Sequence, residues 1–356
     1  MDNKFKLLAA VALCPLGLAA TPAYAAGTQA GTTITNTVSV NYKVGGISQT
    51  AQSASNSVTV DRKINLTMTT AASTTTVAPG ATAQVTAYTL TNTSNDTLDF
   101  ILSVAQQSGG TAQHGGTDVF DTSNVVIYQD NNANGVVDAG DAVITYLDEV
   151  APDTTKNILV VSDIPNSQTN GQVAGIVLTA QAAAGGSAGS QGVVLTATSG
   201  ANTAGVDNVL ADTAGATDAA NDGKFSVKGD YTVLAPVLTV TKISSVISDP
   251  VNGATSSAKA IPGATLEYCI VVANAAGAAT ATNVAVSDTL PNTIAYASAY
   301  GIFVNGTATG TAPSYTCNTD GTAGGIYNAG TTTVTGSLNN LAAGSTETVR
   351  FRATIN

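Results

Sequence analysis

The stretch whose side chains could do the most specific chemistry is Asp130–Asp141, with the sequence DNNANGVVDAGD. It fits the twelve-residue calcium-loop pattern, which has oxygen-bearing side chains at loop positions 1, 3, 5, 9 and 12 and glycine at position 6. The predicted Ca²⁺ ligands are the side chains of Asp130, Asn132, Asn134, Asp138 and Asp141 and the backbone carbonyl of Val136. The pattern leaves one alternative open, a turn-rich Asn/Gly loop that holds no ion.

The flanking residues predict that this loop is the tip of a β-hairpin. An EF-hand loop lies between helices, but here the neighbours are the β-branched runs 125–128 (VVIY) and 143–146 (VITY), which favour strands. Asp141 at the last position reaches less far than glutamate, which disfavours bidentate binding. With three carboxylates and an extracellular setting, we expect weak affinity, on the order of 10⁻⁴ to 10⁻³ M. Asp218 and Asp222 repeat part of the pattern, with Ala220 where an oxygen is needed, and leave a second ion site as an open alternative.

No stretch of the sequence predicts catalysis. The single histidine, His114, lies in a glycine-rich loop, where we expect an exposed spacer residue. A Ser/His/Asp site would have to use it, and no nucleophile-elbow motif is present. Paired carboxylates for glycoside hydrolysis remain open, because separation in sequence does not give separation in space. We expect a protein that is not an enzyme.

The first 25 residues have the composition of a signal peptide. Lys4 and Lys6 precede an apolar run over 7–20, and Ala23-Tyr24-Ala25 supplies the small residues of a cleavage site. No later run of 18 apolar residues follows, so we expect no transmembrane segment in the mature chain. Cys14 follows Leu13, which is too large for the usual lipoprotein cleavage site, so we expect no lipid anchor at this cysteine. The sequence therefore predicts a secreted or extracellular cell-surface protein.

Export determines how the remaining cysteines are interpreted. Cys269 and Cys317 are the two that survive processing, and such a pair in an oxidising compartment favours a disulfide. Two separate buried thiols are the alternative. The even-numbered residues of 266–272 are apolar, so Cys269 is expected on the opposite face of that strand, bonded to a loop that carries Cys317.

Composition predicts an all-β fold and argues against one class of partner. Among 356 residues there are 35 glycines and no tryptophan, and 10% of residues are charged. Thr and Val favour strands, and Gly, Asn and Asp favour turns. The formal charge of −11 argues against binding to nucleic acid, which needs clustered Lys and Arg. The charge suits an extracellular chain that recruits cations, and an acidic surface that only aids solubility explains it at least as well.

The chain divides into three mature parts. Residues 26–62 form a predicted N-terminal β-hairpin arm, with alternating Val38, Val40, Tyr42 and Val44 before a Gly45-Gly46 turn. The arm is too short to enclose a core, so it either completes a sheet of its own first domain or docks onto a neighbouring subunit. Residues 63–235 form a predicted β-sandwich that carries the calcium loop, with later strands at 158–161, 173–180 and 193–197 and an irregular loop over 207–230. Pro236 marks the start of a second sandwich, residues 236–356.

The two sandwiches share a pattern. In each, a Pro-Gly turn precedes a strand that ends at an asparagine, Asn92 in the first and Asn274 in the second. This spacing indicates an internal duplication of one module.

Residues 236–356 also carry a recognisable run. Pro262-Gly263, Asn283-Val284, Asp288-Thr289-Leu290-Pro291 and Val349-Arg350-Phe351 together resemble the conserved repeat domain of bacterial cell-surface proteins. Residues 64–200 resemble it only loosely. The resemblance implies an immunoglobulin-like β-sandwich of largely unknown function and brings no catalytic residues with it.

These observations favour a structural protein of the bacterial cell exterior, such as a filament, surface-layer or matrix subunit, that associates with itself or with other cell-surface components. The alternative is a monomeric adhesin or carbohydrate-binding module. Such a module needs an exposed aromatic platform, and six Phe and eleven scattered Tyr do not predict one.

Overall fold

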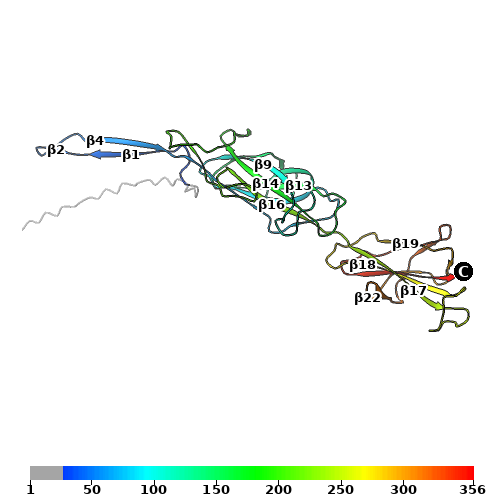
Figure 1. Cartoon of the computed structure of the whole chain (residues 1–356). Coiled ribbons are helices and arrows are strands. Elements are labelled where there is room, and N and C mark those ends of the chain that lie inside the picture. The colour runs from blue at the N-terminus through cyan, green and yellow to red at the C-terminus, as the bar shows by residue number, and fades with distance from the viewer. Residues whose placement is uncertain (1–26) are drawn as a thin grey trace, which may run out of the picture.

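The computed structural model describes residues 27–356, and the predicted signal peptide lies outside this range. The prediction of an all-β fold built from β-sandwiches is confirmed. Figure 1 shows a narrow two-stranded ribbon at one end, a first sandwich in the middle and a second sandwich at the other end. No helix in residues 27–356 is long and apolar enough to cross a membrane.

The first sandwich consists of two five-stranded sheets. One sheet has the order β11 (Ala142–Val143), β10 (Ser123–Asp130), β13 (Thr155–Asp163), β8 (Gln84–Asn92) and β6 (Leu66–Thr70). The other has the order β12 (Tyr146–Val150), β9 (Leu98–Gln106), β14 (Val173–Ala184), β16 (Lys224–Val233) and β7 (Thr75–Val77). A short parallel pair, β5 (Arg62–Ile64) and β15 (Asn208–Leu210), adjoins them.

Alternation along the strands fills the first core. On β8, Thr86, Tyr88, Leu90 and Asn92 are buried and the residues between them are half-buried, because successive side chains point to opposite faces. They meet Phe100 and Ile176 from the opposite sheet. The result is one apolar layer between the two sheets.

Two sequence predictions in this sandwich are wrong. The irregular loop expected over 207–230 contains β15 and most of β16, and the strand expected over 193–197 makes a single β-bridge at Val194. Gly229 and Asp230 give this part of β16 the composition of a turn. The Tyr88 ring packs against β16 at Gly229, where a Cβ would lie 2.0 Å from the Tyr88 hydroxyl. Tertiary packing therefore explains the glycine.

The second sandwich is asymmetric. Its larger sheet has the order β17 (Leu238–Ser248), β18 (Thr265–Asn274), β27 (Thr346–Ile355), β21 (Ile302–Gly306) and β24 (Thr322–Ala323), and β20 (Ile294–Tyr296) also pairs with β27. Facing it is a three-stranded sheet, β19 (Ala285–Thr289), β26 (Thr333–Ser337) and β25 (Ile326–Asn328). Ile270, Val349 and Phe351 lie in the core between them.

The two asparagines of the sequence repeat occupy equivalent places. Asn92 ends β8 opposite Leu66, and Asn274 ends β18 opposite Leu238. The Asn92 amide donates to the carbonyl oxygens of Val150 and Asp96 at 2.8 and 2.9 Å. The Asn274 amide likewise donates to Leu341 and Ala279 at 3.0 and 2.7 Å. Each buried amide thus ties the end of a strand to backbone of the facing layer, as a duplicated module would.

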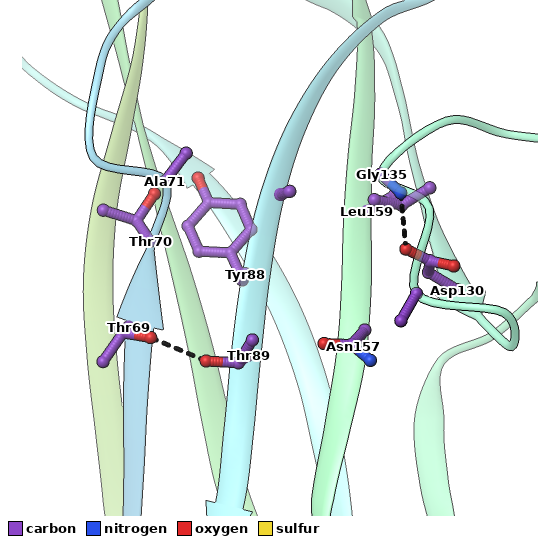
Figure 2. Close-up of a pocket in the computed structure, with 11 residues that line it drawn as sticks. Thr69, Thr70, Ala71, Tyr88, Thr89, Asp130, Gly135, Asn157 and Leu159 are labelled. Atoms are coloured by element: carbon purple, nitrogen blue, oxygen red, sulfur yellow. Dashed lines mark hydrogen bonds between the residues drawn. The ribbon is translucent and has the colours of Figure 1, made fainter.

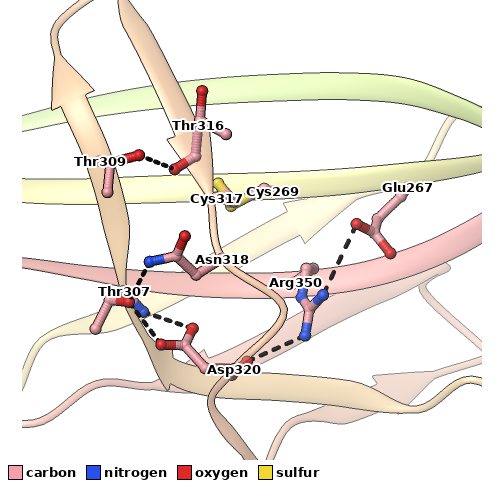
Figure 3. Close-up of a disulfide and its surroundings, with 9 residues drawn as sticks. All are labelled: Glu267, Cys269, Thr307, Thr309, Thr316, Cys317, Asn318, Asp320 and Arg350. Carbon is pink, nitrogen blue, oxygen red and sulfur yellow. Dashed lines mark hydrogen bonds and ion pairs between the residues drawn. A yellow bond between two sulfur atoms is a disulfide. The ribbon is translucent and has the colours of Figure 1, made fainter.

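The Cys269–Cys317 disulfide is confirmed. Cys269 lies on the face of β18 opposite the core residue Ile270, as predicted. Cys317 lies on a strand and not in a loop: it ends the hairpin of β22 (Ala308–Thr311) and β23 (Ser314–Cys317). Figure 3 shows this hairpin and the segment after it over the outer face of the sheet, where the buried Arg350 donates to the Asp320 carbonyl at 3.1 Å.

Replacing Asn92 with alanine tests the role of the buried amide. Asn92→Ala leaves the Val150 and Asp96 carbonyls without this donor, so we expect the free energy of unfolding to fall by about 2 kcal/mol. Denaturant titration measures the change. Thr91→Ala, on the other face of the same strand, is the control: it removes one hydroxyl contact with Thr155 at the surface and should cost no more than about 1 kcal/mol. Equal losses for the two variants would contradict the assignment.

The disulfide gives a second stability prediction. The bond closes a loop of 48 residues, and the chain-entropy model assigns it about 4 kcal/mol. Cys269→Ala/Cys317→Ala should therefore unfold the second sandwich at much lower denaturant concentration, while the first sandwich keeps its midpoint. Titration of thiols in the unfolded, unreduced protein should find none from these two residues. Two free thiols would contradict the disulfide.

Candidate functional sites: the acidic hairpin loop and the exposed ribbon

The predicted calcium loop is the tip of a β-hairpin, as its flanking residues indicated. β10 and β11 pair with Tyr128 opposite Val143 and Gln129 opposite Ala142. Asp130 ends β10 and is buried, and its two carboxylate oxygens accept from the backbone N–H groups of Asn134 and Gly135 at 3.3 and 3.0 Å. Gly135 has φ of +76°, a conformation that favours glycine at the sharp turn. Figure 2 shows the loop curled over Asp130.

Asp138 is the centre of the outer half of the loop. Its Oδ2 accepts from the side-chain amides of Asn132 and Asn134 at 2.7 and 2.9 Å, and its Oδ1 accepts from Gly140 N–H at 2.8 Å. The Gly140 N–H and then the two amides stabilise the ionised form and lower the pKa of the Asp138 carboxyl. The carboxylate therefore stays charged to lower pH than a free aspartate.

The last predicted ligands close the loop. Asp141 accepts from the backbone N–H groups of Asn131 and Asp138 at 3.1 and 3.0 Å. Val136 donates its N–H to the Asn134 side-chain oxygen at 3.0 Å. All the predicted side-chain ligands are thus linked through one hydrogen-bonded loop, and their oxygens are of the kind that hard cations prefer.

A shallow cavity of about 190 Å³ lies beside the loop (Figure 2). Its floor is formed by β6, β8 and β13, and Thr69 and Thr89 share a hydroxyl contact of 2.6 Å at its edge. Tyr88 points from this floor into the core, where burial raises the pKa of its hydroxyl. The cavity is smaller than the roughly 300–1,000 Å³ of typical small-molecule sites.

The structure gathers one acidic group that the sequence did not indicate. The ligand atoms of Asp99, Asp148 and Glu149 lie within 4.8 Å of one another, close enough to hold a metal ion. Among residues 27–356 no other three acidic, histidine or cysteine side chains come this close together. Each of these carboxylates also accepts a hydrogen bond from a backbone N–H group in the loop that follows β14. Gly192 N–H, for example, donates to Asp99 at 2.8 Å. Asp99 and Asp148 are brought together by the pairing of β9 with β12, which sequence separation conceals.

The second partial calcium motif is held by its own backbone. Asp218 accepts from Gly215 N–H at 2.9 Å and from the Ser226 hydroxyl, and Asp222 accepts from Lys224 N–H at 2.9 Å. These contacts fix the turn that leads into β16.

The expectation that His114 is an exposed spacer is wrong. Its Nδ1 lies 2.8 Å from a carboxylate oxygen of the buried Asp230, and its backbone N–H donates to the other oxygen at 2.7 Å. Its Nε2 lies 3.0 Å from the Ala71 carbonyl. The sequence could not show this pair, because 116 residues separate its members. His114 thus hydrogen-bonds to a buried acid and joins three distant segments.

The N-terminal ribbon is the second candidate site. β1 (Thr33–Val40) and β4 (Gln52–Thr59) pair only with each other, so the expectation that the arm completes a sheet of the first sandwich is wrong. The ribbon tip carries the short strands β2 (Lys43–Val44) and β3 (Ile47–Ser48). Asn95 holds the base by donating to the carbonyls of Thr28 and Asp61 at 3.0 and 2.9 Å. Beyond this base the ribbon projects from the sandwich (Figure 1).

The two faces of the ribbon differ sharply in chemistry. Paired positions place four cross-strand pairs on one face: Ile34 and Val58, Asn36 and Asn56, Val38 and Ala54, Val40 and Gln52. The other face consists of serine and threonine alone, with Thr35 and Ser57 hydroxyls 2.7 Å apart. Every large apolar residue of the first face is about half exposed or more. β1 and β4 contain no charged residue.

Replacing His114 tests its structural role. His114→Ala removes the side-chain hydrogen bond to the buried Asp230, so we expect the free energy of unfolding to fall by about 2 kcal/mol. Gln113→Ala, at an exposed neighbouring position, is the matched control and should change it little. Chemical denaturation measures both. A His114→Ala variant as stable as the control would show that the contact contributes nothing.

Comparisons with known proteins do not identify a family. No protein-family model and no curated protein matches the chain. A solved structure named "BspA_C_WT" is 9% identical, over 79% of this chain and 86% of that one, with a TM-score of 0.35. A putative membrane anchored protein from Corynebacterium diphtheriae is 10% identical, over 91% and 89%, with a TM-score of 0.19. TM-scores this low establish no common arrangement, so the resemblance to the conserved repeat domain stays a prediction from the sequence.

Proposed function

We propose that this chain is a non-enzymatic, exported structural protein of the bacterial cell exterior, a subunit of a filament, surface layer or matrix. Its N-terminal ribbon docks onto a neighbouring subunit by β-strand addition, and calcium at the Asp130–Asp141 loop stabilises the first sandwich. The observation that carries this proposal is the projecting ribbon, with an uncovered apolar face and uncharged strands.

The ribbon supports assembly for two physical reasons. A two-stranded hairpin is marginally stable alone in water, so an ordered ribbon whose apolar face is exposed gains most from a partner that covers it. In addition, exposed edge strands are usually protected by lysine, proline or bulges, and β1 and β4 have none of these. The single charge between residues 33 and 59 is Lys43, at the tip.

The hairpin loop supports the calcium part of the proposal. The loop orders three carboxylates and two amides around a glycine turn, and these side chains offer the oxygen ligands that a hard cation prefers. The loop connects adjacent strands of one sheet, β10 and β11, so an ion there would fix the hairpin without ordering any other element.

The remaining side chains support a structural function over catalysis or sugar binding. His114 is engaged with Asp230 and is not one of the residues that line the cavity beside the loop. Tyr268, Tyr296 and Tyr327 pack against the second core, and Tyr296 stacks on Tyr327 at 4.4 Å between ring centroids. These rings serve the fold and do not make a flat platform for a sugar.

Calcium should stabilise the first sandwich. At a free concentration ten times the dissociation constant, binding to the folded state alone adds about 1.4 kcal/mol to the free energy of unfolding. We expect millimolar calcium to raise the melting temperature of the intact protein, and much less that of Asp138→Asn/Asp141→Asn. Asp121→Asn, exposed and outside the loop, is the control. Identical melting curves for the intact protein in calcium and in chelator would remove the ion from the proposal.

Removing the ribbon tests assembly. Gly31 N–H donates to the Val60 carbonyl and Val60 N–H to the Thr32 carbonyl, both at 2.9 Å, so residues 32–59 can be deleted and the ends joined through one glycine. We expect a folded monomer with nearly unchanged unfolding, whereas the full mature chain forms polymers visible by electron microscopy. A deletion variant that assembles like the full chain would exclude the ribbon. A full chain that stays monomeric at high concentration with calcium would exclude assembly.

A further inference from the structure

The second sandwich has an open groove of about 370 Å³ along one side. It lies between β17 and β19, and each of these strands has a single strand neighbour among the described residues, β18 and β26 respectively. The lining is mainly apolar, with Leu238 and Val240 on one wall, Val284 and Val286 on the other, and core residues of β18 at the bottom. Two unpaired strand edges therefore border a mainly apolar surface on which Leu238 and Val240 are exposed.

The first sandwich shows how the equivalent position can be covered. Leu66 and Met68 of β6 pair with Asn92 and Leu90, as Leu238 and Val240 of β17 pair with Asn274 and Val272. In the first sandwich Leu66 and Met68 are 0% and 4% exposed, whereas Leu238 and Val240 are 43% and 67% exposed. The same positions are core in one module and surface in the other.

The cover in the first sandwich is an antiparallel two-stranded unit. β14 pairs with the free side of β9, β16 pairs with β14, and β16 packs across the core onto β6. In the second sandwich, β19 and β26 correspond to β9 and β12 of the first. β26 pairs with β19 and is followed in the chain by β27, just as β12 pairs with β9 and is followed by β13. Within residues 236–356 no strand lies beside β19 in the place of β14 and β16. The groove has the position of a missing antiparallel ribbon.

We propose that the β1–β4 ribbon of a second copy of this chain fills the groove, with its apolar face over Leu238 and Val240 and one of its strands paired to the free edge of β19. This inference rests on the proposed function and names the acceptor that the assembly uses. The ribbon matches this empty position in three respects: it is antiparallel and two-stranded, five of the eight residues on one face are apolar, and its strands bring no charge into a mainly apolar groove.

A ribbon that fills this groove belongs to another copy and not to the same molecule. Figure 1 shows the ribbon and the second sandwich at opposite ends of the chain, with the first sandwich between them. Such a head-to-tail contact propagates along a filament unless its rotation closes a ring. The groove also has a defined end: Lys242 of β17 and Asp288 of β19 form an ion pair across it at 2.6 Å. The ribbon therefore enters from the Leu238 end.

Two surface substitutions with matched controls test the pairing. Val38→Glu places a charge on the apolar face of the ribbon, and Ser39→Glu places it on the hydroxyl face. Val240→Glu places a charge in the groove, and Thr239→Glu places it on the other face of the same strand. All four positions are exposed, so each full mature chain should fold, which its melting curve checks. Sedimentation in calcium measures assembly of each protein and of mixtures.

The expected result is a pattern of complementation. Val38→Glu and Val240→Glu should each raise the concentration needed for assembly by about a hundredfold, and both controls should assemble like the parent. An equimolar mixture of Val38→Glu and Val240→Glu should form heterodimers and stop there, because one intact groove meets one intact ribbon.

The other outcomes separate this inference from the proposal it rests on. If Val38→Glu stays monomeric while Val240→Glu and a second groove variant, Leu238→Glu, assemble like the parent, the ribbon docks elsewhere and only this inference fails. If the mixture yields no heterodimer, the inference also fails. If Val38→Glu assembles like the parent, or the parent never assembles, ribbon-mediated assembly itself is overturned.

Discussion

The constraint on which the rest of this structure depends is that both inner faces of a β-sandwich must be covered. Each sheet has one apolar face, and water must be excluded from it by a second sheet of comparable width. The first sandwich meets this requirement within itself, because β14 and β16 lie opposite β8 and β6 and bury Leu66 and Met68. The second sandwich does so over its centre, where β19 and β26 close the core around Val334 and Val349.

The same requirement explains why the ribbon and the groove are the informative surfaces. Elsewhere buried polar side chains connect distant segments. Asn92 and Asn274 hydrogen-bond the ends of their strands to the facing layer, and the buried Asp230 accepts a hydrogen bond from the His114 backbone and contacts its ring. At the ribbon and along β17 such contacts lie only at the ends, with Asn95 at the ribbon base and Lys242–Asp288 at one end of the groove, and the valines of both surfaces remain in solvent. Both surfaces are apolar on one side and bordered by free strand edges, which is the chemistry of strand addition.

The loop and the disulfide act on a more local scale. The Asp130–Asp141 loop orders one hairpin, and the Cys269–Cys317 bond holds the β22–β23 hairpin against the outer face of β18. That hairpin leads directly into the segment whose Asp320 carbonyl accepts from the buried Arg350. Both devices stabilise peripheral hairpins and leave the ribbon and the groove free.

The sequence by itself determined what depends on neighbouring residues. Composition predicted the all-β class, and the strands expected at 158–161 and 173–180 lie within β13 and β14. β-branched flanks predicted the hairpin around Asp130–Asp141, and the face of Cys269 followed from its neighbours on one strand. Tertiary structure decided what depends on distant segments. The glycine and acid of β16 resemble a turn until Tyr88 and His114 pack against them, and Asp99 meets Asp148 only through strand pairing. Whether an apolar strand face is buried was likewise decided in three dimensions: Leu66 and Leu238 have the same local pattern, and only the presence or absence of a facing ribbon separates core from surface.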